Sequence, residues 1–410
     1  MGKIDTGIQQ RVVAAMDEMN QLIKERSDVI KSVWIGRIAQ EHVLMLGPGG
    51  TGKSFLARSM WDHIDGSTGF ESAFDETTDP SQVFGPPDIK AMVENGKTRR
   101  VVTNMLPEAT DAFLDEFFNG NGPLLHSLQP VLNERVFHNN GIPHAIPLRQ
   151  AIMGTNKINA DVELAPLFDR VHIRHTVDYT RDRSNQSDMV GEAIARMSLV
   201  GRGVTTSISA SHTKVTVDEL DQAHKEALSL DVDEAVMDLF LDIKDELKSK
   251  GIVISDRRMV EGMAAVLASA WIAGHEQVKP GDLDILANMW WVVQDHAAEA
   301  RSVVLAATNP GEKAALDLLD ELDKIKKEIA ESEGLDEDRR RRVGVEAVRN
   351  TDKLIREAQG HKEKSLAAGA STERLQETIE KAQNFKIEVG RSVFHLDPTS
   401  MAAMTAASNA

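Results

Sequence analysis

The stretch GPGGTGKS, residues 47–54, limits the possible folds of this chain more than any other segment. It places four glycines, a lysine and a serine directly after the apolar run HVLML, residues 42–46. Residues 54–64, which follow it, read as a helix. A short apolar strand, a glycine-rich loop and a helix in this order predict the first unit of a parallel α/β sheet.

The loop matches the P-loop pattern in full, through the residues Gly47, Pro48, Gly49, Gly50, Thr51, Gly52, Lys53 and Ser54. Its glycines let successive backbone N–H groups point inward, and the helix N-terminus adds a dipole that favours anions. Lys53 would reach the β- and γ-phosphates of a nucleotide, and Ser54 would hold magnesium. The alternative is a glycine-rich turn between a strand and a helix with no ligand.

A second apolar run, DAFLDE at residues 111–116, ends in two carboxylates. Asp115 would support the magnesium ion through its waters, and Glu116 would polarise the attacking water. The alternative is an acidic N-terminus of the next helix. The strand before Asp115 is short and contains Asp111, which suggests slow hydrolysis.

Two further polar residues stand at strand ends. Asn156 ends the predicted strand 149–156, where it would orient water or serve only as a turn residue. Arg170 begins the predicted alternating strand 170–177. Its permanent charge suits the charge that develops on a phosphate in a transition state. Arg170 could act in this way on the site of a neighbouring copy of the chain. An ion pair with Asp169 explains Arg170 equally well.

A helix is predicted to open within residues 254–262, capped by Ser255 or Asp256. Arg257 and Arg258 fall in its first turn, where the helix dipole disfavours cations. A bound γ-phosphate would explain their position, and a solvated pair of arginines is the alternative.

The pattern of the chain predicts three domains: residues 1–180, 189–305 and 311–400. Strands alternate with helices in the first, with helices expected at 8–40 and at 124–136, where Pro130 predicts a kink or break. Residues 180–188 read as a polar linker. The second domain is almost entirely helical. The third has two charged helical stretches, 313–333 and 336–386, which suggest a hairpin or coiled coil.

Composition excludes some functions. The 410 residues contain no cysteine, so thiol catalysis and cysteine-ligated zinc are excluded. The net charge of −17 argues against general binding of nucleic acid or of an anionic membrane. No secretory signal and no membrane-spanning stretch is recognisable, so we expect a cytoplasmic protein. The spacing of the histidines along the chain does not match that of metal ligands. Trp290 and Trp291 are predicted to be core residues.

Taken in order, these motifs resemble an AAA+ ATPase, more narrowly the MoxR family and its RavA-like members. The resemblance covers about residues 10–300. HVLMLGPGGTGKS is similar to the family's strand and Walker A motif, and FLDE to its Walker B motif. DPSQVFGP, residues 79–86, is similar to a segment after the second strand. GTNK resembles sensor one, LFDRV the arginine-finger segment and SDRR sensor two.

The resemblance implies an α/β P-loop core with helices on both faces, followed by an all-α lid and a C-terminal helical extension. It implies Asn156 as sensor one, Arg170 as arginine finger and Arg257 as sensor two. It places two inserts at about 86–108 and 133–149.

The resemblance also implies ATP and Mg²⁺, a homo-oligomeric ring that is usually a hexamer, and a partner with a von Willebrand factor A domain. The implied function is chaperone-like remodelling of a protein client. Two alternatives stay open: a DNA-associated AAA+ motor or loader, and a nucleotide-gated scaffold with little turnover.

Overall fold

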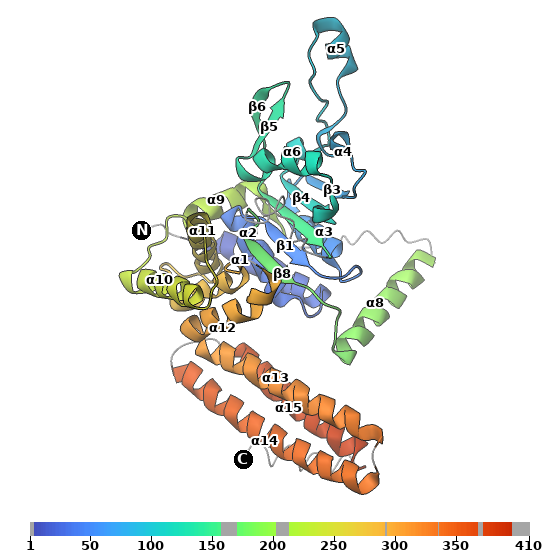
Figure 1. Cartoon of the computed structure of the whole chain (residues 1–410), viewed down its shortest axis with the longest axis vertical. Helices are drawn as coiled ribbons and strands as arrows, with labels where there is room; N and C mark the ends of the chain where they lie inside the picture. The colour runs from blue at the N-terminus through green and yellow to red at the C-terminus, as the bar shows by residue number, and fades with distance from the viewer. Residues whose placement is uncertain are drawn as a thin grey trace. The chain divides into compact units, whose positions relative to one another are not determined.

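The computed structural model describes residues 4–156, 170–201, 213–291, 293–334, 336–367 and 372–395 (Figure 1). Asp169, the alternative partner of Arg170, lies outside the described residues. The chain divides into two compact units, Met1–Ala300 and Arg301–Ala410.

The first unit contains a five-stranded parallel sheet with the strand order β3-β4-β7-β1-β8. Its strands are β1 (Val43–Leu46), β3 (Gly69–Ala73), β4 (Asp111–Asp115), β7 (Gln150–Thr155) and β8 (Ile173–Thr176). Because every strand runs in the same direction, the segments that follow the strands meet at one edge of the sheet. This confirms the predicted α/β class.

Four helices precede or connect the strands of the sheet along the chain: α1 (Thr6–Leu22), α2 (Ser27–Ala39), α3 (Lys53–Asp62) and α6 (Gly122–Asn133). Helix α2 packs against β1, β7 and β8, and α3 packs against β4 and β7. The single helix expected over 8–40 is wrong, because Glu25 takes a left-handed backbone (φ 58°) between α1 and α2. Pro130 lies inside α6 and does not end it.

Two edge strands differ from the sequence pattern. In β3 only Phe70 is buried, so no apolar run marks this strand. Strand β8 is shorter than the expected 170–177, and it does not alternate, because Ile173, Arg174 and His175 are all buried. Arg174 Nη1 donates to the Trp291 carbonyl over 2.6 Å, so a segment of the helical domain covers this strand.

Two inserts project from the same end of the sheet in Figure 1. The first contains α5 (Ile89–Asn95) and follows the short helix α4 (Pro80–Phe84); the second is the hairpin of β5 (Val136–Asn139) and β6 (Ile142–Ala145). Asn139 Oδ1 accepts from Arg100 N over 2.7 Å, and Asn140 Oδ1 accepts from Thr98 N over 3.1 Å. The hairpin turn is therefore hydrogen-bonded to the first insert.

The helical part of the first unit begins earlier than expected. Helix α8 (Arg183–Gly201) starts inside the predicted linker, where Asp182 Oδ1 accepts from two backbone N–H groups of its first turn. Strand β2 (Ile64–Asp65) pairs with β9 (Val215–Thr216). The other helices of this unit are α9 (Val217–Ala227), α10 (Glu234–Ser249) and α11 (Asp256–Ile272), with short 3-10 helices at Leu106–Glu108, Phe117–Asn119, Pro280–Asn288 and Gln294–His296. Helix α12 (Ala297–Thr308) contains the boundary between the two units. Trp290 is buried against Phe240, with ring centroids 4.7 Å apart, as expected of a core residue.

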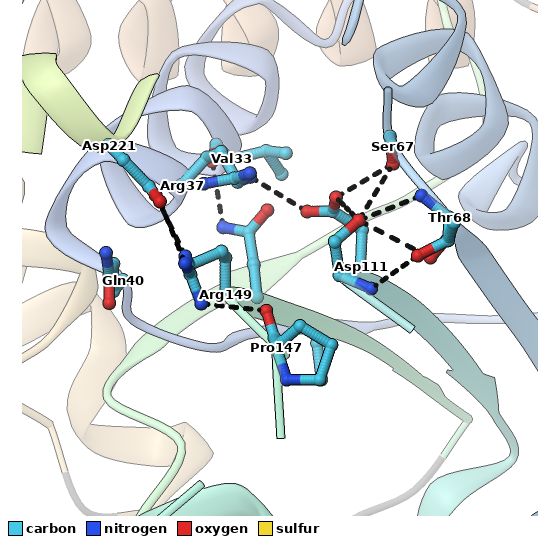
Figure 2. Close-up of polar contacts among 12 residues, drawn as sticks. Val33, Arg37, Gln40, Ser67, Thr68, Asp111, Pro147, Arg149 and Asp221 are labelled. Atoms are coloured by element: carbon cyan, nitrogen blue, oxygen red, sulfur yellow. Dashed lines mark hydrogen bonds and ion pairs between the residues drawn. The ribbon is translucent and has the colours of Figure 1, made fainter. Parts of the chain in front are cut away.

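Asp111 has a structural partner at the amino-terminal edge of the sheet. Its Oδ1 lies 2.8 Å from Arg37 Nε of α2, and both side chains are buried (Figure 2). Its Oδ2 accepts from Ser67 Oγ over 2.8 Å. Arg149 forms an ion pair with Asp221 of α9 at the same edge, which fastens α9 to the sheet. Asp111 therefore belongs to a buried network away from the glycine loop.

The second unit is a three-helix bundle of α13 (Pro310–Glu331), α14 (Glu337–Ala367) and α15 (Glu373–Ser392), with a 3-10 turn at Ser332–Gly334. Each helix contacts the other two. The second predicted stretch is therefore two helices, and the expected hairpin becomes a bundle. Its core includes Leu318, Leu322, Ile325, Leu354, Ile355, Ile379, Phe385 and Val389. None of the helices described in either unit has the length and apolar character needed to cross a membrane.

Candidate functional site

The glycine loop joins the carboxyl end of β1 to α3. Gly47 N donates to the Thr155 carbonyl over 2.9 Å, and a Cβ on Gly47 would lie 1.8 Å from the Val177 carbonyl oxygen. Only glycine fits there. Gly50 and Gly52 have φ values of 80° and 85°, the left-handed region that glycine adopts without strain. Added Cβ atoms at these two residues would meet nothing within 4 Å, so this side of the loop is open.

Lys53 is the first residue of α3, and its side chain turns back into the loop. Its Nζ donates to the carbonyls of Gly47 over 2.7 Å and Pro48 over 3.1 Å, and it lies 3.5 Å from Asn156 Oδ1. Only 7 % of Lys53 is exposed. A buried ammonium group beside an open glycine loop at a helix N-terminus is suited to bind phosphate oxygens.

Gly154 of β7 explains how Asp115 approaches Lys53. A Cβ on Gly154 would lie 2.3 Å from Asp115 Oδ1 and 3.3 Å from Lys53 Cε. The missing side chain therefore makes room for the carboxylate and for the lysine stem. Sequence reasoning did not assign this glycine a role, although a glycine within the buried strand QAIMGT was a signal that something approaches closely.

Glu116 and Asn156 meet across the ends of β4 and β7. Asn156 Nδ2 donates to Glu116 Oε1 over 2.6 Å, and Asn119 Nδ2 donates to Glu116 Oε2 over 3.1 Å. Glu116 has a left-handed backbone, with φ 49°. A sequence of contacts thus runs from Lys53 through Asn156 to Glu116. The structure therefore brings these three predicted residues together. It also adds Asn119, which the sequence analysis did not identify.

Ser54 and Asp115 are the candidate magnesium ligands. Ser54 is the second residue of α3, Asp115 is the last residue of β4, and both are half-buried. A hydroxyl and a carboxylate are hard oxygen donors, and Mg²⁺ commonly takes few protein ligands while keeping water and substrate phosphates. The donor set therefore fits Mg²⁺.

Arg170 lies at the other end of the sheet from the loop. It precedes β8, whose Ile173 pairs with Val43 at the start of β1, whereas the loop follows Leu46 at the end of β1. At about 3.3 Å per residue, β1 alone separates the two edges by roughly 10 Å. Its Nη1 has no hydrogen-bond partner among the described residues. Arg170 is not part of the site formed by its own loop.

Arg257 is also not with the other predicted residues. It is exposed in the first turn of α11, while Arg258 is buried and donates from Nη1 to the Trp291 carbonyl over 2.9 Å. Helix α11 packs on α2 and α9. A role of Arg257 at a nucleotide stays a prediction, and the predicted solvated pair does not describe Arg258.

A pair of carboxyl groups joins α11 to the sheet. Burial raises the pKa of Glu41, just before β1, to about 7. Burial, followed by the hydrogen bond and charge of Glu41, raises the pKa of Glu261 in α11 to about 7. His172 Nδ1 lies 2.6 Å from Glu41 Oε2. The two carboxyl groups at the contact between the helical domain and the sheet therefore keep their protons to a higher pH than exposed glutamates do.

Tyr179 borders the loop on the side of β8. Its hydroxyl donates to the Gly49 carbonyl over 3.2 Å, and 57 % of the residue is exposed. The sequence analysis gave it no role. No motif marks it, because the contact depends on β8 lying next to β1.

Comparison with known proteins agrees with this geometry. Residues 10–222 match the family described as the MoxR domain in the MoxR-vWA-beta-propeller ternary systems, and residues 235–304 match an AAA lid domain.

Among similar proteins, two uncharacterized proteins of Methanocaldococcus jannaschii are each 28% identical to this chain. One alignment covers 90% of this chain and 96% of the relative, and the other covers 78% and 81%. A structural protein of Acidianus two-tailed virus is 30% identical over 39% of this chain and 26% of its own length. The crystal structure of an ATPase candidate from Cytophaga hutchinsonii has a TM-score of 0.57 at 14% identity, covering 74% of this chain and 94% of that one, and it supports the fold alone.

Proposed function

Because this chain belongs to the MoxR family of AAA+ ATPases, we propose that it hydrolyses ATP to ADP and phosphate at the Gly47–Ser54 loop. The observation that carries the proposal is the sequence of contacts from Lys53 through Asn156 to Glu116. It joins a phosphate-binding loop to a carboxylate that can act as a base.

Each residue has a defined task in this reaction. The backbone N–H groups of the loop and the Lys53 ammonium bind the β- and γ-phosphates. Glu116 accepts a proton from a water molecule, whose oxygen attacks the γ-phosphorus while the bond to the β–γ bridging oxygen breaks. ADP takes the electron pair of that bond, and inorganic phosphate leaves with the water oxygen. Asn156 holds the Glu116 carboxylate by its amide N–H.

Ser54 and Asp115 would hold Mg²⁺. The ion, when bound, neutralises charge on the phosphate oxygens. Gly154 supports this role of Asp115, because it leaves the space that the carboxylate occupies beside Lys53.

We assign Arg170 to the site of a neighbouring copy. Its position at the opposite edge of the sheet from its own loop supports this assignment, since an arginine finger must reach the γ-phosphate. The chain would then work as a homo-oligomeric ring, which we propose to be a hexamer. Arg257, exposed at the start of α11, is proposed to act on a phosphate as sensor two.

The biological role we propose is chaperone-like remodelling of a protein client in the cytoplasm. The matched family is described from systems that contain a vWA component, which supports a partner with a von Willebrand factor A domain. The net charge of −17 weighs against the DNA motor.

The test is the hydrolysis rate of Glu116→Gln, with Glu76→Gln as an exposed control of the same charge change. We expect Glu116→Gln to lose at least about a hundredfold in kcat while binding ATP, because glutamine cannot accept the proton. Equal rates for Glu116→Gln and the wild type would remove Glu116 from the mechanism. Turnover that rises on adding DNA would favour the motor instead.

A further inference from the structure

The order of the strands gives the proposed nucleotide a direction across the sheet. At the carboxyl edge, Glu116 follows β4, Asn156 follows β7, the loop follows β1 and Tyr179 follows β8. The strands β4-β7-β1-β8 are neighbours in this order, so Glu116 and Tyr179 lie on opposite sides of the loop. Neighbouring strands are about 4.8 Å apart, so the two residues are separated by roughly 14 Å.

The reacting end of a nucleoside triphosphate must face Glu116, because that carboxylate would activate the water. The nucleoside must then leave the loop on the opposite side, toward β8. The described residue that contacts the loop from that side with an exposed ring is Tyr179, through its bond to the Gly49 carbonyl.

Tyr179 is held in place by its own segment. Its backbone N donates to Asp178 Oδ1 over 2.8 Å, and Arg26 Nη2 donates to the Asp178 carbonyl. Glu25, in the turn between α1 and α2, accepts from Arg181 N over 3.0 Å and from Asp182 N over 2.9 Å. The exposed ring is thus fixed at its hydroxyl and along the backbone, although it is not packed into a core.

We propose that the Tyr179 ring is the surface on which the base of the bound nucleotide packs, with Arg26 and Glu25 as positioning residues. The inference rests on the proposed function, because it takes the phosphates to lie in the loop. A flat aromatic face suits a base of any identity, while the loop binds only phosphate. The Tyr179 ring would then strengthen the binding of a nucleotide but not the binding of a phosphate chain that has no base.

The test compares two ligands in the full-length protein by calorimetry: a non-hydrolysable ATP analogue and inorganic tripolyphosphate, both with Mg²⁺. For Tyr179→Ala we expect about tenfold to hundredfold weaker binding of the analogue, the usual loss on removing a base-stacking ring. Binding of tripolyphosphate should stay within twofold, which also shows that the variant is folded. Tyr179→Phe keeps the ring and should bind both ligands like the wild type.

Three outcomes would overturn the inference. Equal losses for both ligands in Tyr179→Ala would mean that the residue only shapes the loop, and no loss for either would mean that the base lies elsewhere. A wild type that binds tripolyphosphate as tightly as the analogue would remove the base contact but leave the loop function intact. A wild type that binds neither ligand would remove the proposed function itself.

A second measurement uses the wild type. The chain has one tyrosine, so nitration by tetranitromethane reports on Tyr179 alone. We expect the ATP analogue to slow nitration and tripolyphosphate to leave the rate unchanged. Equal rates with the two ligands would contradict the proposal.

Discussion

Asn156 Nδ2 donates a 2.6 Å hydrogen bond to Glu116 Oε1. The same amide presents Oδ1 toward Lys53 Nζ, 3.5 Å away. A side-chain amide has a donor end and an acceptor end, so it can stand between a carboxylate and an ammonium group in one orientation only. The pair therefore couples the water-activating side of the candidate site to its phosphate-binding side.

Asn156→Ala should lower kcat by about tenfold to a hundredfold, because the Glu116 carboxylate loses the donor that orients it. The affinity for ATP should change little. Steady-state kinetics separates the two effects, and Asn95→Ala, exposed at the end of α5, is the control. A rise in KM with unchanged kcat would contradict the orienting role.

Gly154→Ala should damage the site without touching any charged group. The new Cβ would meet Asp115 Oδ1 at 2.3 Å and displace it. We expect at least about a tenfold loss of hydrolysis, since small misplacements of reacting groups are costly. Gly122→Ala is the control, because its Cβ would meet nothing within 4 Å. Unchanged turnover in Gly154→Ala would show that the Asp115 position is not needed.

Arg170→Ala should lower hydrolysis by about a thousandfold, as removal of an arginine finger does. Lys53→Ala should be inactive because it cannot bind the phosphates. A mixture of the two variants should regain activity, since Lys53→Ala chains still offer Arg170 to their neighbours. A mixture no more active than its parts would exclude a role in trans.

The pair Glu41–Glu261 should make stability depend on pH. The folded-state pKa of both groups is raised from 4.5 to about 7. Their contribution is therefore complete below about pH 4.5 and is lost as the pH rises through about 7. The midpoint temperature of unfolding should therefore fall between about pH 4.5 and pH 7, and this pair should add no further change above that range.

Glu261→Gln stays neutral at every pH, so it should flatten this fall. Glu276→Gln, an exposed residue, should follow the wild type. His172, Arg135 and Arg257 act electrostatically on the pair and stay in both variants. Parallel curves for Glu261→Gln and the wild type would contradict the raised pKa of Glu261.

Asp111→Asn should lower the free energy of unfolding by about 3–5 kcal/mol, because Arg37 would keep a buried charge without its partner. Urea unfolding measures this, with the exposed Asp238→Asn as control. The double variant Arg37→Met with Asp111→Leu should recover most of the loss. A double variant as unstable as Asp111→Asn would mean that the ion pair itself, rather than the orphaned charge, decides stability.

The sequence was sufficient for the elements with a strong local signal. The strand before Gly47 and the strand ending at Asp115 are short apolar runs, and both are present. The MoxR resemblance was carried by six short segments and is confirmed by the family match over residues 10–222.

Features that depend on neighbours in space were not predictable. Strand β3 has one buried residue, so it leaves no apolar run in the sequence. The sequence does not indicate that Arg174 and Asp111 are buried, because their partners Trp291 and Arg37 are far from them along the chain. The contact of Tyr179 with Gly49 needs the strand order, which the sequence alone did not give.

The two inserts share hydrogen bonds through Asn139 and Asn140, which bind the backbone of Arg100 and Thr98. A displacement of α5 must therefore either carry the β5–β6 hairpin with it or break these bonds. A force applied to one insert would therefore be transmitted to the other. The hydrogen bonds of Asn139 and Asn140 would be the first interactions to break.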